Sequence, residues 1–157
     1  MNPFPPRPRL RRGLYLVLTE PPRGYERMAE WAVAAGLPAL QLRPKPSPPR
    51  PAPDIATDRD FLRVARALRA ITRGSPTLLL IDDRPDLALL CEADGLHVGQ
   101  DDLPPADARR LIGPRPLLGL STHTLAQVRA AAIRALADAP DPARAMASLQ
   151  HRLSPPL

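Results

Sequence analysis

Apolar residues along this chain gather in five short runs, and longer segments with helical spacing separate them. We expect strands at residues 14–19, 38–42, 77–81, 95–98 and 117–120. We expect helices at residues 25–35, 58–73, 86–93, 105–112 and 124–137. Short apolar runs between helical segments are typical of strands buried in a parallel sheet. The strand–helix pattern, repeated five times, therefore predicts an α/β fold with right-handed crossovers.

The clearest helical pattern lies in residues 58–73. Its apolar residues form one stripe, while Arg63, Arg66 and Arg69 lie on the opposite side and are expected to be exposed. In the segment 25–35, Trp31 shares an apolar face with its neighbours, which predicts a packing role.

Polar side chains follow three of the expected strands directly. Asp82 and Asp83 follow the third strand, Asp102 lies shortly after the fourth, and Ser121 follows the fifth. In parallel α/β folds, ligands bind beyond the carboxyl ends of the strands. These residues therefore predict a ligand site at that end of the sheet.

Asp83 and Asp102 would lie at the ends of neighbouring strands, so both carboxylates can face one volume. Two oxygen ligands plus waters suit Mg²⁺, particularly where a substrate phosphate completes the coordination shell. The alternative is that each aspartate caps the helix that follows it. Spacing alone favours this capping role.

The exit of the second strand carries Gln41, Arg43 and Lys45, which alternate and so point to the same side. A guanidinium beside an ammonium is a good grip for pyrophosphate, and the amide can hold a polar ring or a phosphate edge. The alternative is a solvated strand end. Ser121 can donate to a phosphate, or the Ser121–Thr122 pair can cap the next helix.

Composition sets the domain limits. The chain has 157 residues, whereas an eight-stranded barrel needs about 250. Its 23 prolines concentrate near residues 3–8, 44–53 and 140–156. We expect a disordered basic tail at residues 1–12, a folded domain at 13–137 and an irregular tail at 138–157. No sixth apolar run follows, and an open five-stranded sheet has two unpaired edges that favour self-association.

Charge and cysteine content limit the partners and the compartment. The net charge is +6, but the arginines are dispersed and aromatic residues make up only 3%, which disfavours nucleic-acid binding. Cys91 is the only cysteine, so an intramolecular disulfide is excluded; we expect a core thiol in a reducing compartment. The apolar run at residues 14–18 is too short for a signal sequence or a membrane span. These features predict a cytoplasmic protein without membrane partners.

Four ordered motifs resemble the thiamine phosphate synthase family. They are QLRPK (41–45), IDDRPDLAL (81–89), ADGLHVGQDDLP (93–104) and GLSTHT (119–124). The resemblance implies a (β/α)₈ TIM barrel, of which this chain supplies about five βα units. It also implies a Mg²⁺-dependent transferase that joins hydroxymethylpyrimidine, taken from its pyrophosphate, to a thiazole phosphate. The products are thiamine phosphate and pyrophosphate.

The resemblance also implies roles for individual residues. Gln41, Arg43, Lys45, Asp82 and Ser121 would bind the pyrimidine pyrophosphate. The metal ligands would be Asp83 and Asp102.

Two departures from the family pattern matter. Asp82 stands where the family has Asn, and a carboxylate adds repulsion beside pyrophosphate unless it is protonated or meets the metal. Family segments of the later strands, including a Thr/Lys phosphate loop and the thiazole-phosphate loops, have no match here. We therefore expect a C-terminally truncated or frame-shifted chain that is inactive alone. The alternative is a non-catalytic phosphate-binding or regulatory relative, similar to thiazole tautomerase-like proteins.

Overall fold

The computed structural model describes residues 7–44 and 54–127 of the chain. Lys45, the rest of the proline-rich segment up to residue 53 and the predicted tail at 138–157 lie outside the described residues, as does the part of the predicted helix beyond residue 127. The chain divides into two compact units, Met1–Leu120 and Ser121–Leu157, and each is described by itself.

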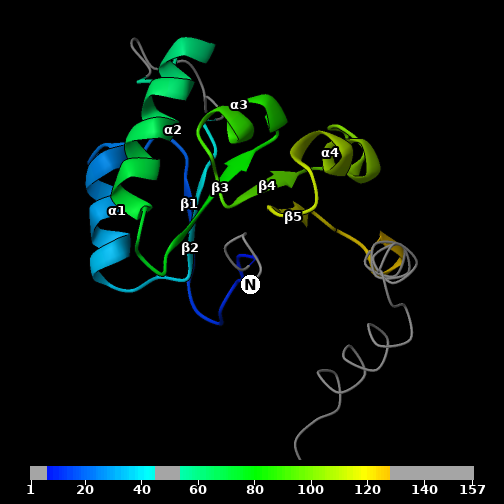
Figure 1. The fold of residues 1–157 in the computed structure, drawn as a ribbon, viewed down its shortest axis with the longest axis horizontal. Coiled ribbons are helices and arrows are strands. Elements are labelled where there is room, and N and C mark those ends of the chain that lie inside the picture. Colours follow the sequence, from blue (N-terminus) through cyan, green and yellow to red (C-terminus); the bar gives the residue numbers. More distant parts are fainter. Residues whose placement is uncertain (1–6, 45–53, 128–157) are drawn as a thin grey trace, which may run out of the picture. The chain divides into compact units, whose positions relative to one another are not determined.

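A five-stranded parallel sheet forms the centre of the first unit (Figure 1). Its strand order is β1-β2-β3-β4-β5, so every strand pairs with its neighbours along the chain. The strands are β1 (Tyr15–Leu18), β2 (Ala39–Leu42), β3 (Leu78–Asp82), β4 (Gly95–Val98) and β5 (Leu117–Leu120). The predicted parallel α/β fold is confirmed, whereas eight barrel units are not seen in the described residues. β1 and β5 are the outer strands of this sheet. Self-association through these open edges stays a prediction.

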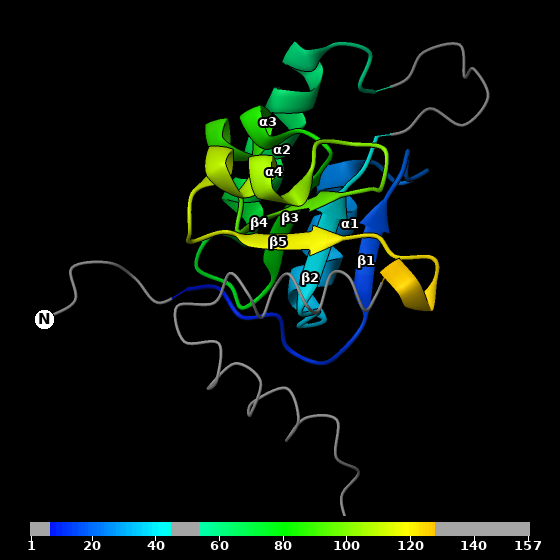
Figure 2. The same ribbon diagram turned by 90° about the vertical axis from the view of Figure 1, so that its right-hand side faces the viewer.

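One helix follows each of the first four strands. The helices are α1 (Tyr25–Ala34), α2 (Asp58–Thr72), α3 (Pro85–Leu90) and α4 (Pro105–Ile112). They lie on one side of the sheet, as the two perpendicular views show (Figures 1 and 2). None of the helices within the described ranges is long and apolar enough to span a membrane.

The apolar core lies between the sheet and these helices. Alternate strand side chains supply it: Leu18, Leu40, Leu42, Leu79, Ile81, Leu96 and Val98 are each at most 1% exposed. The other face is less covered, since Val17 is 45% exposed and every residue of β5 is only partly buried. The prediction of buried strands is therefore wrong for the outer strands, β1 and β5.

Two helical predictions need correction. Trp31 is 51% exposed, because the buried stripe of α1 runs through Tyr25, Ala29 and Ala32 instead. The helix expected at residues 86–93 ends at Leu90. Cys91 caps it and is buried, so the core thiol is confirmed.

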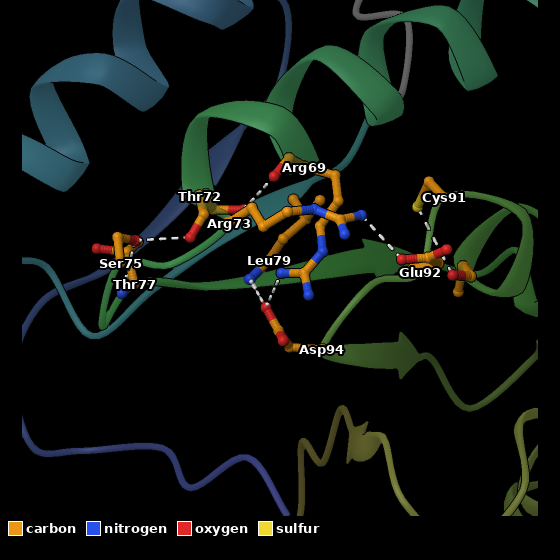
Figure 3. Close-up of polar contacts among 10 residues, drawn as sticks. Arg69, Thr72, Arg73, Ser75, Thr77, Leu79, Cys91, Glu92 and Asp94 are labelled. Atoms are coloured by element: carbon orange, nitrogen blue, oxygen red, sulfur yellow. Dashed lines mark hydrogen bonds and ion pairs between the residues drawn. The ribbon is translucent and has the colours of Figure 1, made fainter. Parts of the chain in front are cut away.

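The end of the sheet where the strands begin, called here the amino-terminal edge, is closed by polar contacts around Asp94 (Figure 3). One oxygen of Asp94, Oδ2, accepts from the Leu79 backbone N–H and from the Arg69 guanidinium, both at 2.9 Å. Arg69 was expected to be exposed, and this is wrong: its side chain is 20% exposed and ties the end of α2 to the start of β4. Nearby, the Arg73–Glu92 ion pair at 2.8 Å is largely solvated.

We expect Asp94→Ala to lower the free energy of unfolding by about 2 kcal/mol, because it leaves a backbone donor and a mostly buried guanidinium without their shared acceptor. Urea unfolding measures this. The matched control is Glu92→Ala, which removes an exposed ion pair and should change stability by less than about 1 kcal/mol. Equal losses in the two variants would contradict the role assigned to Asp94.

Candidate functional site

The residues expected to bind ligand converge where the strands end. Gln41 lies within β2 and Arg43 directly follows it, while Asp82 is the last residue of β3. Because Leu42 pairs with Ile81, the next residues along the two strands, Arg43 and Asp82, lie side by side. The sheet therefore brings the polar residues of the QLR and IDD segments together.

A continuous set of polar contacts crosses three strands at this end. The Tyr15 hydroxyl donates to Gln41 Oε1 at 3.1 Å, and Gln41 Nε2 donates to Asp82 Oδ1. Arg43 Nε lies 3.3 Å from Asp82 Oδ2. We call Tyr15, Gln41, Asp82 and Arg43 the inner-face network.

Two members of the inner-face network are buried, so their polar groups need partners inside the fold. Gln41 and Asp82 are only 4% and 5% exposed, whereas the Arg43 side chain is 40% exposed. The Asp82 carboxylate receives a guanidinium and an amide N–H, which match its charge inside the fold. The expected repulsion from an Asp at this position is thus offset by Arg43, the same residue expected to hold pyrophosphate.

Tyr15 was not recognised as a site residue from the sequence. Burial raises its pKa to about 12, and the negative charge of Asp82 adds to this effect. The phenol is therefore neutral at physiological pH and remains a hydrogen-bond donor. Period-two alternation could have indicated it, since Tyr15 and Val17 alternate along β1 and Val17 pairs with Gln41.

Asp83 occupies a tight turn directly after β3. Its φ is 58°, a left-handed conformation that aspartate tolerates better than most residues. Its backbone N–H donates to the His97 carbonyl at 2.8 Å, which extends the pairing of β3 with β4 by one bond. The N-cap residue of α3 is Arg84, whose side chain makes no capping bond, so the capping alternative for Asp83 is wrong.

Asp102 lies in the loop after β4, and its Oδ2 accepts from the Gly99 N–H at 2.8 Å. A Cβ at Gly99 would approach this oxygen to 2.6 Å, so the glycine allows the close contact. Pro104, without a side-chain bond, caps α4; the capping alternative is therefore wrong for Asp102 too. Gly119 also allows close packing, because a Cβ there would meet the ring of His97 at 2.5 Å.

Arg84 fixes the turn that carries Asp83. Its guanidinium bonds to both oxygens of Asp58, at the start of α2, and to both oxygens of Asp86, at the start of α3. These bonds lower the pKa of both carboxyls and raise that of Arg84. Nothing in the spacing of the sequence indicated this clamp, because Asp58 is distant along the chain.

Ser121 begins the second unit, where it is partly buried. The next helix is capped by Thr124, whose Oγ1 accepts from the Gln127 N–H at 3.2 Å, while Gln127 Oε1 accepts from the His123 N–H at 2.7 Å. The alternative that the Ser121–Thr122 pair caps this helix is therefore wrong. The phosphate contact of Ser121 stays a prediction.

Asp83 and Asp102 have the donor atoms that Mg²⁺ prefers. Across the described parts of the chain, no group of three or more His, Cys, Asp or Glu residues could hold a metal ion. Mg²⁺ usually keeps several waters and takes one or two carboxylates plus substrate phosphates. A pair of carboxylates at adjacent strand ends fits this mode of binding.

A mainly apolar cavity of about 600 Å³ lies elsewhere, at the amino-terminal edge. Arg69, Leu78, Leu89, Asp94 and Arg115 are among its lining residues. None of the inner-face network lines it. The inner-face network lies at the opposite end of the strands, where ligands of parallel α/β folds bind.

Together, the sequential parallel sheet and the polar side chains gathered at its carboxyl end define an α/β protein with a candidate site where ligands of such folds bind. The family model for thiamine monophosphate synthase matches residues 14–141, and the chain belongs to this family.

Individual relatives agree with the family. A thiamine-phosphate synthase from Gloeobacter violaceus is 47% identical over 128 residues, which is 82% of this chain and 33% of the relative. One from Solidesulfovibrio magneticus is 49% identical over 100 residues, 64% of this chain and 43% of the relative. The solved thiamine phosphate pyrophosphorylase from Pyrococcus furiosus superposes with a TM-score of 0.63 at 28% identity, covering 74% of this chain and 53% of that one. This chain thus spans about a third to a half of the length of these relatives.

The pKa of Tyr15 gives a pH-dependent prediction. Folding raises it above the ordinary value near 10, so its contribution to stability is complete below about pH 10 and is lost as the pH rises towards 12. The stability advantage of the parent over Tyr15→Phe should therefore shrink between about pH 10 and about pH 12, measured by urea unfolding. Tyr25 titrates in both proteins and cancels in the comparison. A constant difference across this range would contradict the raised pKa.

Proposed function

We propose that this chain carries the pyrimidine-pyrophosphate site of a thiamine phosphate synthase. The reaction would be Mg²⁺-dependent transfer of hydroxymethylpyrimidine from its pyrophosphate to a thiazole phosphate, giving thiamine phosphate and pyrophosphate. Family membership supports the reaction class. The observation that carries the proposal is the convergence of Gln41, Arg43 and Asp82, with Asp83 beside them, at the ends of adjacent strands.

The proposed chemistry needs few proton transfers. The bond between the pyrimidine methylene carbon and the pyrophosphate oxygen breaks, and its electron pair leaves with the pyrophosphate. The thiazole nitrogen then bonds to the carbon. Arg43, and Lys45 outside the described residues, would hold the leaving group through charge-assisted hydrogen bonds.

Mg²⁺ held by Asp83 and Asp102 would offset the negative charge that develops on the leaving pyrophosphate. Gln41 would orient the pyrimidine pyrophosphate, because its amide is fixed by two neighbours and buried from water. Ser121 would add a hydroxyl donor to the pyrophosphate. We further propose that the five βα units belong to a TIM-barrel arrangement, which the sequential parallel strand order supports.

The test of the reaction is direct. The purified chain, given both substrates and Mg²⁺, is assayed for thiamine phosphate by fluorescence after oxidation to the thiochrome form. Product formation supports the transferase. Saturable binding of pyrophosphate without product would instead support the non-catalytic binding role, and absence of both would overturn the proposal.

Arg43 is best tested in a background that leaves no unpaired buried charge. Arg43→Ala alone removes the cation beside the buried Asp82 carboxylate. We therefore compare Asp82→Asn with Arg43→Ala/Asp82→Asn. Loss of a charge-assisted contact should weaken Mg²⁺-pyrophosphate binding at least about 10-fold by calorimetry. Arg66→Ala in the same Asp82→Asn background removes an exposed arginine of α2 and is the charge-matched control. If the two arginine variants bind alike, Arg43 does not hold the ligand.

Asp82→Asn on its own should tighten pyrophosphate binding about 5-fold. The Asn oxygen still accepts from Gln41, while the charge that competes with the ligand for Arg43 is gone. Calorimetry with inorganic pyrophosphate and Mg²⁺ measures the change. A clear loss of affinity would show that Asp82 itself serves the metal.

Asp102→Asn should remove most of the Mg²⁺ dependence of pyrophosphate binding, because an amide is a much weaker ligand for this hard cation. The Asn oxygen can still accept from Gly99, so the loop should keep its fold. Asp101→Asn changes the exposed neighbouring residue by the same charge and is the control. Unaltered Mg²⁺ dependence in Asp102→Asn would remove this residue from the metal site.

A further inference from the structure

A buried carboxamide must be oriented by its neighbours, because its two ends have the same shape but opposite hydrogen-bonding character. Gln41 is such a group: it is 4% exposed and lies between β1 and β3. Asp82 can only accept when ionised, so the nitrogen end of Gln41 has to face it. The oxygen end then faces Tyr15, whose hydroxyl donates to it at 3.1 Å.

The contacts of the inner-face network run in one direction. Tyr15 donates to Gln41, Gln41 donates to one oxygen of Asp82, and the other oxygen of Asp82 faces Arg43 at 3.3 Å. Each contact limits the rotation of the next side chain. Two buried side chains, Gln41 and Asp82, thus connect Tyr15 to the partly exposed guanidinium of Arg43.

We propose that Tyr15 is a positioning residue for pyrophosphate binding, which orients the Gln41 amide. This inference rests on the proposed function of the site. Tyr15 leaves Gln41 with one N–H and one oxygen lone pair for a ligand, because the other N–H and the other lone pair are used inside the fold. A polar ligand edge that offers one acceptor and one donor would match this remainder.

The inference distinguishes positioning from simple burial. Tyr15→Phe keeps the ring and removes only the hydroxyl, so a packing role would be unaffected. The chain offers a matched control, since the hydroxyl of its other tyrosine, Tyr25, is also hydrogen-bonded and accepts from the Glu20 backbone N–H at 3.1 Å. Tyr25→Phe removes a comparable bond that does not involve the inner-face network.

The first measurement needs no ligand. In ¹⁵N-labelled full-length chain, the side-chain amide signals of Gln41 are identified by their disappearance in Gln41→Leu. In the parent, one amide proton should exchange slowly with solvent because it is bonded to a buried carboxylate. Tyr15→Phe should accelerate this exchange at least about 5-fold, whereas Tyr25→Phe should not. Unchanged Gln41 signals in Tyr15→Phe would overturn the positioning role.

The second measurement is affinity for inorganic pyrophosphate with Mg²⁺, by calorimetry. Tyr15→Phe should bind about 5-fold more weakly than the parent, and Tyr25→Phe should bind equally well. In the Gln41→Leu background, Tyr15→Phe should have no further effect, because the residue through which it acts is gone. Additive losses would overturn the inference.

The outcomes separate the two proposals. If the parent does not bind pyrophosphate, the proposed function fails, while the exchange data still decide whether Tyr15 orients Gln41. If the parent binds and Tyr15→Phe matches it, only the positioning role fails. Should Tyr15→Phe not fold, 3-fluorotyrosine incorporated into Tyr25→Phe labels Tyr15 alone and makes its hydroxyl a stronger donor. The Gln41 amide signals should then shift, and no shift would overturn the inference.

Discussion

The buried carboxylate of Asp82 is the constraint on which the candidate site depends. An ionised carboxylate that is 5% exposed is stable only if donors surround it; Gln41 of β2 and Arg43, directly after β2, are two of them. This requirement fixes the amide of Gln41, which in turn gives Tyr15 its partner. The carboxylate at the end of β3 therefore determines how the polar side chains of β2 and β1 are oriented.

The two ends of the sheet have different tasks. At the amino-terminal edge, Asp94 accepts from Leu79 and Arg69 and joins α2 to the start of β4. At the other end, Arg84 holds the beginnings of α2 and α3 around the turn that carries Asp83. The polar contacts at the amino-terminal edge join helix to sheet, whereas those at the other end orient the side chains of the candidate site. Helices and strands connect the two, so a site built from short strands still rests on rigid elements.

The sequence predicted the elements well where a strong period coincided with a clear stop. The bounds of β4, β5 and α4 agree with the expected ranges, since glycine or proline flanks each of them. The packing role predicted for Trp31 was wrong because two stripes of α1 have apolar spacing, and the alanine-rich stripe is the buried one. The prediction that Arg69 is exposed was wrong because a helical period indicates on which face of the helix a residue lies, but not which partner its side chain contacts. Of the site, the residues at strand ends were predicted, but the hydrogen bonds among Tyr15, Gln41 and Asp82 depend on strand register, which periodicity alone does not provide.

The sequential strand order also affects how the chain reaches its fold. Each strand pairs with the strand before it in the chain, so every pairing closes a single helical connection and no strand is inserted between two formed neighbours. Ala39 pairs with Leu78 across the long connection that contains α2, whereas Leu80 pairs with Gly95 across the short one that contains α3. Loop-closure entropy rises with the length of the connection. The entropic cost of pairing is therefore lowest for β3 and β4, the strands that place Asp82 beside His97.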